Sequence, residues 1–148
     1  MFKIKLSRFY QVSIIALILA VVLFDQSTKV WVKKGGFFNW SDFFDLGYYI
    51  NYGTAFGIPV PYVLLFPLIF ISLGLIIWKY FRFVREGYMW AYLALFMIVG
   101  GALSNVADRI NYGFVIDYIH FWFGSTFNLA DCLIILGVGI LIIKELKK

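Results

Sequence analysis

The chain has few of the residues on which small soluble proteins rely for charge, disulfides or metal binding. It contains one cysteine, Cys132, and one histidine, His120, and only 14% of its 148 residues are charged, where about 25% is usual. A single cysteine excludes an intramolecular disulfide and a cysteine metal cluster, so we expect Cys132 to be a small buried hydrophobic residue. No H-E-x-x-H pattern is present, and His120 would have to serve alone in a Ser/His or Cys/His mechanism. We therefore favour an interfacial aromatic role for His120 over a catalytic base.

Apolar residues are abundant instead. Hydrophobic residues make up 63% of the chain and aromatic residues 22%, and the mean hydropathy is +0.88. A soluble domain of this size has too little interior to bury so much apolar surface. Lipid must cover the rest, which excludes an ordinary cytosolic enzyme, a disordered chain and a disulfide-stapled secreted module.

Four apolar segments are long enough to cross a bilayer, which requires about 20 residues in a helix. We expect them at about residues 9–32, 60–78, 88–106 and 127–143. The first follows three cations, as in a secretory signal peptide, but it continues past Asp25 and no A-x-A-like cleavage site follows. The composition therefore predicts an all-α membrane protein with four transmembrane helices, as a single membrane domain over residues 1–148.

The positions of the charged residues predict the orientation of these helices. Nine of the thirteen Lys and Arg residues lie at the N-terminus, at the C-terminus or between the second and third segments, and six of the eight acids lie on the opposite side. Because cytoplasmic segments carry the excess of Lys and Arg, both termini are expected in the cytoplasm. The net charge of +5 then reflects topology and anionic lipids rather than nucleic acid.

Two segments would lie outside the membrane. The first, residues 33–59, alternates around Leu46–Tyr52 and predicts a small β-rich part between the first two helices. The second, residues 110–126, is expected to hold aromatic residues at the depth of the lipid headgroups.

Polar residues gather beside all four helices at the same outer level of the membrane. These clusters are Asp25–Lys29, Asn51–Phe56, Asn105–Arg109 and Asn128–Asp131. Ionisable residues near a membrane interior are costly and usually mark a functional site, and four clusters at one depth favour a single site there.

Several of these residues also fit structural roles. Asp25 and Lys29 are spaced i and i+4, so they can form an ion pair that braces the helices. Arg109 can bind carbonyl groups or a lipid phosphate, or anchor its helix at the headgroups. Asn105 and Asn128 can satisfy backbone groups where helices end. Small residues allow close helix packing, and this role fits Gly100, Gly101 and Ser104.

Asp117 and Asp131 differ because neither has a cation at helical spacing. Two carboxylates in a poorly solvated site cannot both ionise easily, so the pKa of one rises. Aspartic proteases use this arrangement: the ionised acid takes a proton from water, and the protonated acid polarises the scissile carbonyl.

The motifs around these residues resemble those of the lipoprotein signal peptidases, or type II signal peptidases, across nearly the whole chain. The matches occur in family order: DQSTK at Asp25–Lys29, NYGTAF at Asn51–Phe56, GGALSNVADR at Gly100–Arg109, VIDYI at Val115–Ile119 and FNLAD at Phe127–Asp131. Two positions depart from the family pattern, since Ser104 replaces the usual Gly and Tyr118 the usual Phe.

The resemblance implies an aspartic endopeptidase of the bacterial inner membrane with its active site near the outer leaflet. Such an enzyme removes signal peptides from prolipoproteins just before the diacylglyceryl-modified cysteine. It implies Asp117 and Asp131 as the catalytic pair, no metal or cofactor, membrane lipids as surroundings, and a monomer. The supporting residues that it implies are Asp25, Lys29, Asn51, Gly53, Asn105, Asp108, Arg109 and Asn128.

Three other classes are compatible with parts of the pattern. A proton- or ion-coupled transporter would also carry membrane carboxylates, but it tends to place them near the midplane and to contain internal repeats. A structural subunit would not require two unpaired acids. A presenilin-like protease would have G-x-G-D before one of the acids, and the sequence has none.

Overall fold

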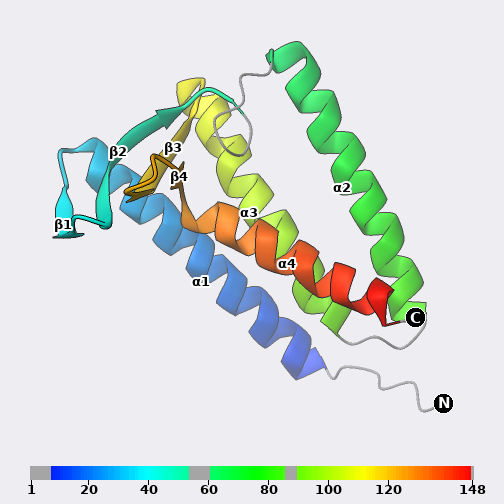
Figure 1. The fold of residues 1–148 in the computed structure, drawn as a ribbon. Helices are drawn as coiled ribbons and strands as arrows, with labels where there is room; N and C mark the ends of the chain where they lie inside the picture. The colour runs from blue at the N-terminus through cyan, green and yellow to red at the C-terminus, as the bar shows by residue number, and fades with distance from the viewer. Residues whose placement is uncertain (1–7, 54–60, 86–89, 148) are drawn as a thin grey trace.

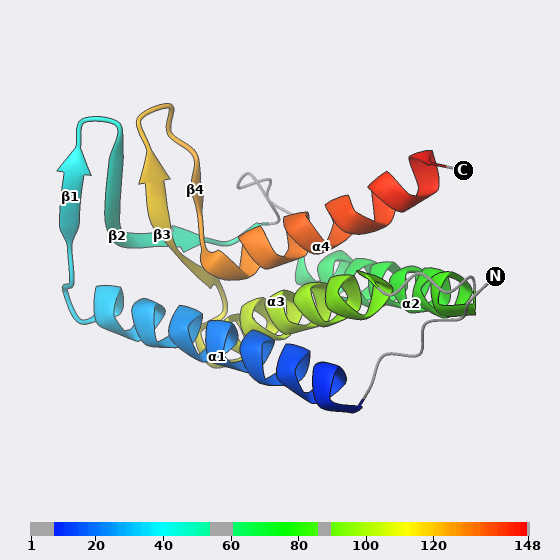
Figure 2. The ribbon, with the colours of Figure 1, turned by 90° about the horizontal axis from the view of Figure 1, so that it is seen from below.

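A computed structural model describes residues 8–53, 61–85 and 90–147, and these contain four helices and four strands (Figure 1). The elements in chain order are α1 (Arg8–Lys33), β1 (Phe38–Ser41), β2 (Phe44–Asn51), α2 (Tyr62–Arg85), α3 (Trp90–Tyr112), β3 (Val115–Phe121), β4 (Thr126–Phe127) and α4 (Leu129–Leu146). The helices lie alongside one another and the strands project from one end of them (Figure 2). The beginning of α1 and the end of α4 lie at the opposite end.

Two helices of the described chain, α1 and α3, are long and apolar enough to cross a membrane. Large apolar side chains such as Leu23 and Phe24 on α1, and Leu103 on α3, are more than half exposed. Contiguous exposed apolar surface of this kind requires a nonaqueous neighbour. The chain is therefore mostly helical, with membrane-capable helices and a small antiparallel sheet.

The sheet has the order β1-β2-β3-β4, and each neighbouring pair is antiparallel. Its second strand confirms the strand expected around Leu46–Tyr52. The sequence predicted strands only between the first two helices, whereas the segment between α3 and α4 supplies two more, β3 and β4. The first four residues of β3 are all buried, and a strand buried on both faces shows no apolar–polar alternation. The periodicity therefore could not reveal it.

The helices also extend beyond the apolar segments that predicted them. The second ends at Arg85 rather than near residue 78, and the third at Tyr112 rather than near residue 106. Hydropathy marks the apolar part of a helix, whereas backbone hydrogen bonding continues through charged residues such as Lys79, Arg82 and Arg109, which have good helix propensity. Asn105 and Asp108 consequently lie within α3 rather than at its end. The expected beginnings at residues 60 and 88 lie outside the described residues.

Helix α3 packs closely against the first turns of α4 at Gly101. A Cβ atom on Gly101 would overlap the carbonyl oxygen of Ala130 and lie 2.9 Å from Cγ1 of Ile134. Only a residue without a side chain allows this approach. Below this contact, Ala94, Ile98 and Leu141 share an apolar core with Phe83 of α2.

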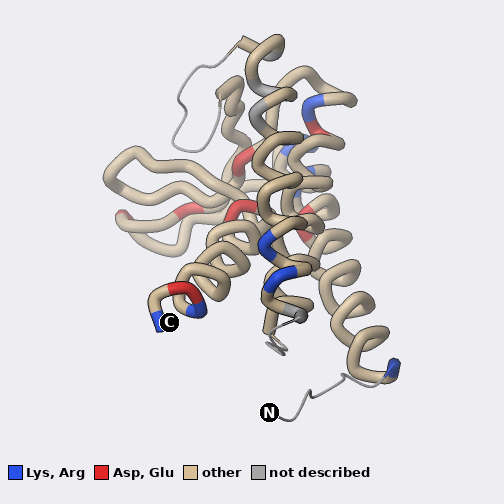
Figure 3. Tube along the Cα trace, turned by 90° about the vertical axis from the view of Figure 1, so that its right-hand side faces the viewer, with Lys and Arg blue, Asp and Glu red and all other residues tan. Residues whose placement is uncertain are grey.

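Charged residues are distributed unevenly along the helices (Figure 3). Of the acidic residues in the described ranges, all except Glu145 lie in the sheet or toward the sheet end of the helices. Glu145 lies near the end of α4, where Lys79 and Arg82 of α2 face it. The carboxylates that are candidates for chemistry therefore share one end of the molecule.

Candidate active site

Asp117 lies on β3 opposite Tyr49 of β2, and its side chain is fully buried. Its Oδ2 accepts hydrogen bonds from Nδ2 of Asn51 at 3.0 Å and from Oγ1 of Thr126 at 3.4 Å. Its Oδ1 accepts from Nδ2 of Asn128 at 2.8 Å. Three elements thus fix the orientation of this carboxyl group.

Asp131 lies in the first turn of α4, and it is partly exposed. Asn128 is the N-cap of this helix: its Oδ1 accepts from the backbone N–H of Asp131 at 3.0 Å, and its own N–H donates to Oδ2 of Asp131 at 3.3 Å. This reciprocal pair is a capping box, which satisfies two N–H groups that have no partner within the helix. The local sequence therefore holds the Asp131 carboxylate at the beginning of α4.

Two asparagine side chains connect the carboxyl groups of Asp117 and Asp131. Asn105 of α3 donates to Oδ1 of Asp131 at 2.8 Å, and its own Oδ1 accepts from Nδ2 of Asn128 at 3.2 Å. Because Asn128 also donates to Asp117, the amides form a continuous bridge between the two acids. Both asparagines thus contact the acids, in addition to the role of Asn128 at the helix end.

Burial and a neighbouring charge alter the titration of Asp117. Burial, followed by the negative charge of Asp131, raises the pKa of Asp117 from its ordinary 3.8 to about 6, although the amides of Asn51 and Asn128 favour its ionised form. A carboxyl group with such a pKa holds its proton in mildly acidic solution. The two acids are therefore arranged to occupy different protonation states.

Lys29 is the centre of a buried ionic cluster behind the two acids. Its Nζ lies 2.9 Å from Oδ2 of Asp25 and 2.9 Å from Oδ2 of Asp108, and all three side chains are at most 1% exposed. Lys29 also donates to Oδ1 of Asn105 at 3.2 Å. The cluster joins α1 to α3 and supports the asparagine that contacts Asp131.

Arg109 connects the residues after β2 to α3. Its Nη2 donates to the carbonyl oxygen of Gly53 at 2.7 Å, and its Nη1 donates to the carbonyl oxygen of Asn105 at 3.3 Å. The N–H of Gly53 in turn donates to Oδ1 of Asn51 at 2.9 Å. Arg109 therefore binds carbonyl groups, which is one of the roles expected for it from the sequence. Through Gly53, this contact holds Asn51 beside Asp117.

All ten residues singled out from the sequence are joined by the hydrogen bonds and ion pairs described above. The sequence did not identify four further participants: Gln26, Ser104, Tyr118 and Thr126. Gln26 donates to Oδ1 of Asp108 at 3.0 Å, and Ser104 donates to Oδ2 of Asp25 at 2.6 Å. Ser104 had been expected only to pack. Ser104 lies on the same helix as Asn105 and Asp108. A hydroxyl group so close to these polar residues is the feature of the sequence that could have indicated a hydrogen-bonding role.

His120 lies on the sheet with a different partner. Its Nδ1 is 2.8 Å from Oδ2 of Asp45, and its ring stacks on Tyr49 at 5.0 Å between centroids. The Tyr49 hydroxyl donates to the other oxygen of Asp45 at 2.6 Å. In the described part of the chain, His120 thus contacts the carboxylate of Asp45 and the ring of Tyr49. Cys132 is half-buried rather than fully buried, and among the described residues no group of three His, Cys, Asp or Glu could hold a metal ion.

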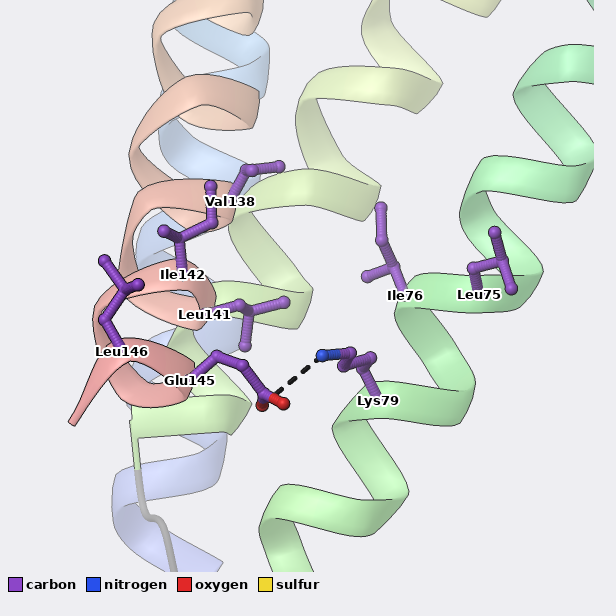
Figure 4. A pocket seen from close by; sticks show the side chains of 8 residues that line it. All are labelled: Leu75, Ile76, Lys79, Val138, Leu141, Ile142, Glu145 and Leu146. Carbon is purple, nitrogen blue, oxygen red and sulfur yellow. Dashed lines mark ion pairs between the residues drawn. The ribbon is translucent and has the colours of Figure 1, made fainter. Parts of the chain in front are cut away.

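An apolar cavity of about 350 Å³ lies between α2 and α4, away from the two acids (Figure 4). It is lined by Leu75, Ile76, Lys79, Val138, Leu141, Ile142, Glu145 and Leu146. The ion pair between Lys79 and Glu145, at 3.3 Å, lies at its charged end. Leu141 is ten residues beyond Asp131, about 15 Å along the helix. The cavity therefore lies between the C-terminal halves of α2 and α4 and is separate from the candidate active site.

The fold is similar to that of known bacterial membrane enzymes. One similar solved structure is a bacterial membrane enzyme determined by the in meso method at 2.3 Å resolution, with a TM-score of 0.76, 26% identity and coverage of 99% of this chain and 93% of that chain. A second bacterial membrane enzyme, determined at 1.9 Å, has a TM-score of 0.69 and 29% identity, and covers 100% of this chain and 99% of that one.

Comparison of sequences identifies the family within this class. Residues 17–147 match the family described as signal peptidase (SPase) II. A lipoprotein signal peptidase of Burkholderia thailandensis is 38% identical over 143 residues, which span 88% of this chain and 85% of the relative. The lipoprotein signal peptidase of Rickettsia conorii is 34% identical over 138 residues, 85% of this chain and 69% of the relative. The chain belongs to the signal peptidase II family.

Proposed function

We propose that this protein is a membrane aspartic endopeptidase that removes signal peptides from diacylglyceryl-modified prolipoproteins, cutting just before the lipidated cysteine. The observation that carries the proposal is the amide bridge between Asp117 and Asp131 through Asn128 and Asn105. It occurs in a member of the signal peptidase II family, and a pair of coupled carboxyl groups is the arrangement that activates water without a metal.

The two acids have different roles in this mechanism. Asp117, buried and with its raised pKa, is the protonated partner that donates a hydrogen bond to the scissile carbonyl oxygen. Asp131, at the beginning of α4 where the helix dipole favours an anion, is the ionised partner. It takes a proton from water as the water oxygen attacks the carbonyl carbon, while Asp117 transfers its proton to the carbonyl oxygen. When the C–N bond breaks, Asp131 gives its proton to the leaving amine, and a hydroxyl group of the gem-diol intermediate gives its proton back to Asp117, so that both acids regain their starting states.

The remaining polar residues position this pair. Asn51 and Asn128 orient Asp117, and Asn105 orients Asp131. The buried cluster of Asp25, Lys29 and Asp108 holds α1 and α3 together behind them. A misplacement of about 1 Å at a reacting group can cost about a hundredfold in rate, so supports of this kind are needed.

The proposal also includes the membrane topology. All four helices span the inner membrane, both termini are cytoplasmic, and the sheet lies at the outer leaflet. The larger share of the described Lys and Arg residues lies away from the sheet, at the beginning of α1 and the ends of α2 and α4, and supports this orientation. A diacylglyceryl group embedded in the outer leaflet would then present the scissile bond at the depth of Asp117 and Asp131.

The experiment is a gel-shift assay with the purified full chain in detergent. The substrate is a prolipoprotein that carries the diacylglyceryl group, and the matched control is the same polypeptide without the lipid. The lipid contributes about 0.8 kcal/mol per buried CH₂, so we expect the lipidated substrate to be cut at least about a hundredfold faster at equal concentration. Cleavage of neither substrate would reject the proposed activity, and equal rates would reject the role of the lipid.

A further inference from the structure

The first turn of α4, which carries Asp131, is held by acceptors from three parts of the chain. The first N–H groups of a helix have no acceptor within it. Here each of the first three has one: Leu129 N–H donates to the Tyr118 hydroxyl at 3.1 Å, Ala130 N–H to Oδ1 of Asp25 at 3.2 Å, and Asp131 N–H to Oδ1 of Asn128 at 3.0 Å. Two of these acceptors, Tyr118 and Asp25, belong to other elements.

The Tyr118 hydroxyl bonds both to the backbone of α4 and to Asp25 of α1. It accepts from Leu129 N–H and donates to Oδ1 of Asp25 at 2.9 Å, and the Tyr118 side chain is 3% exposed. Burial and the negative charge of Asp25 raise the pKa of Tyr118, so the hydroxyl keeps its proton. Tyr118 directly follows Asp117 on β3. One hydroxyl group therefore connects the strand of Asp117 to the helix of Asp131.

Tyr118 and Ser104 both place a hydroxyl group on the carboxylate of Asp25. Ser104 donates to Oδ2 at 2.6 Å, and Tyr118 donates to Oδ1. With Lys29 on Oδ2 and Ala130 N–H on Oδ1, the carboxylate has four donors, about the number that it can accept. Phe at position 118 could neither donate to Asp25 nor accept from Leu129.

We infer that Tyr118 is a positioning residue whose hydroxyl fixes the first turn of α4 against β3 and thereby sets the separation of the Asp117 and Asp131 carboxyl groups. Its effect on catalysis rests on the proposed peptidase function, whereas its effect on the first turn of α4 does not. Ser104 contacts the same carboxylate from α3, and the partners of its hydroxyl among the described residues, Gln26, Lys29 and Asp25, all belong to α1 rather than to β3 or α4. Loss of the Tyr118 hydroxyl should therefore have a consequence that loss of the Ser104 hydroxyl does not share.

The experiment compares Tyr118→Phe with two controls in the full-length protein in detergent. Tyr112→Phe is matched because Tyr112 packs in the same apolar cluster and contacts Phe114 and Lys33 through its ring. Ser104→Ala removes the other hydroxyl on Asp25. The first measurement is hydrogen exchange at the Leu129 amide. The second is cleavage of lipidated prolipoprotein, with kcat, KM and the pH dependence of kcat/KM determined separately.

For Tyr118→Phe we expect exchange at Leu129 to be at least about tenfold faster and kcat to be about tenfold lower, with KM unchanged, as for loss of a hydrogen bond to a charged group. The alkaline limb of kcat/KM should move to lower pH, because a looser pair weakens the effect of Asp131 on Asp117. Tyr112→Phe should match the original protein in every measurement. Ser104→Ala should lower the melting temperature but leave exchange at Leu129 unchanged.

Unchanged exchange in Tyr118→Phe would overturn the connection to α4, and faster exchange with unchanged kcat and pH dependence would overturn its positioning role. If the original protein cuts no lipidated substrate, the proposed function fails and the exchange measurement still decides the connection. If Tyr118→Phe does not fold, 3-fluorotyrosine at position 118 replaces it. Its hydroxyl is a weaker acceptor, so exchange at Leu129 should again become faster, and unchanged exchange would overturn the inference.

Discussion

Asn128 donates a hydrogen bond of 2.8 Å to Asp117 and also caps the helix that carries Asp131. One amide side chain thus orients one acid through its nitrogen and fixes the backbone of the other through its oxygen. Neither function depends on the other, because they use different atoms of the amide group. They can therefore be separated by substitution.

Asn128→Ser should preserve the helix cap and lose the bond to Asp117, because serine is a good N-cap but is too short to reach β3. We expect activity to fall at least about tenfold. Asn128→Ala should lose a further ~1 kcal/mol of unfolding free energy with the cap. Melting temperatures and cleavage rates of the two variants check this. Equal stability of Ser and Ala variants would contradict the capping role, and normal activity of Asn128→Ser would contradict the orientation of Asp117.

The raised pKa of Asp117 predicts a pH dependence. Since Asp117 must be protonated to polarise the carbonyl, kcat/KM should fall as the pH rises through about 6, because this parameter reports the free enzyme. The apparent pKa read from this fall in kcat/KM describes the coupled pair of Asp117 and Asp131 rather than Asp117 alone. Stability should follow the same titration: between pH 3.8 and about 6 the folded protein binds more protons than the unfolded chain, so its unfolding free energy falls as pH rises. In Asp117→Asn this fall should be absent, and a kcat/KM that stayed constant as the pH rose through the pKa of Asp117 would contradict the assignment.

The buried cluster around Lys29 should contribute far more to stability than the surface ion pair at the other end of the helices. Asp25→Asn leaves a buried lysine with one carboxylate fewer, at a cost of about 3 kcal/mol. Lys79→Gln breaks a pair in which both side chains are more than a third exposed, and should cost less than about 1 kcal/mol. Chemical unfolding of both variants tests the contrast. A cost for Asp25→Asn no greater than for Lys79→Gln would show that the cluster does not brace the helices.

Gly101→Ala should displace the beginning of α4. The added methyl group would overlap the Ala130 carbonyl oxygen, and Ala130 is the residue before Asp131. We expect a loss of about 1–3 kcal/mol of stability, as for overpacking, together with reduced activity. Gly139→Ala on α4 is the control, because a methyl group added there would meet no atom within 4 Å. It should be neutral or slightly stabilising, and if both substitutions behaved alike, the close approach of α3 and α4 would not matter.

The sequence predicted the places of four helices because each contains a long apolar segment. It predicted the polar clusters because ionisable residues stand out in apolar surroundings, and Asp25, Lys29 and Asp108 do form a buried cluster. It missed β3 because a strand buried on both faces has no alternation. The Tyr118 and Ser104 hydroxyls were missed because their partner, Asp25, lies 93 and 79 residues away in the chain. Contacts at such separation depend on helix packing, which local patterns do not encode.

In the proposed mechanism, Asp117 and Asp131 act together to cut the substrate. The most direct measurement is single-turnover cleavage of lipidated prolipoprotein by Asp117→Asn and Asp131→Asn, with the melting temperature of each variant determined in the same detergent. Asparagine retains the size of each side chain but can neither take up the proton from water nor supply one to the carbonyl oxygen. We expect both variants to fold, to bind substrate and to lose cleavage by at least about a thousandfold. Cleavage at a near-normal rate by either folded variant would contradict the proposed mechanism.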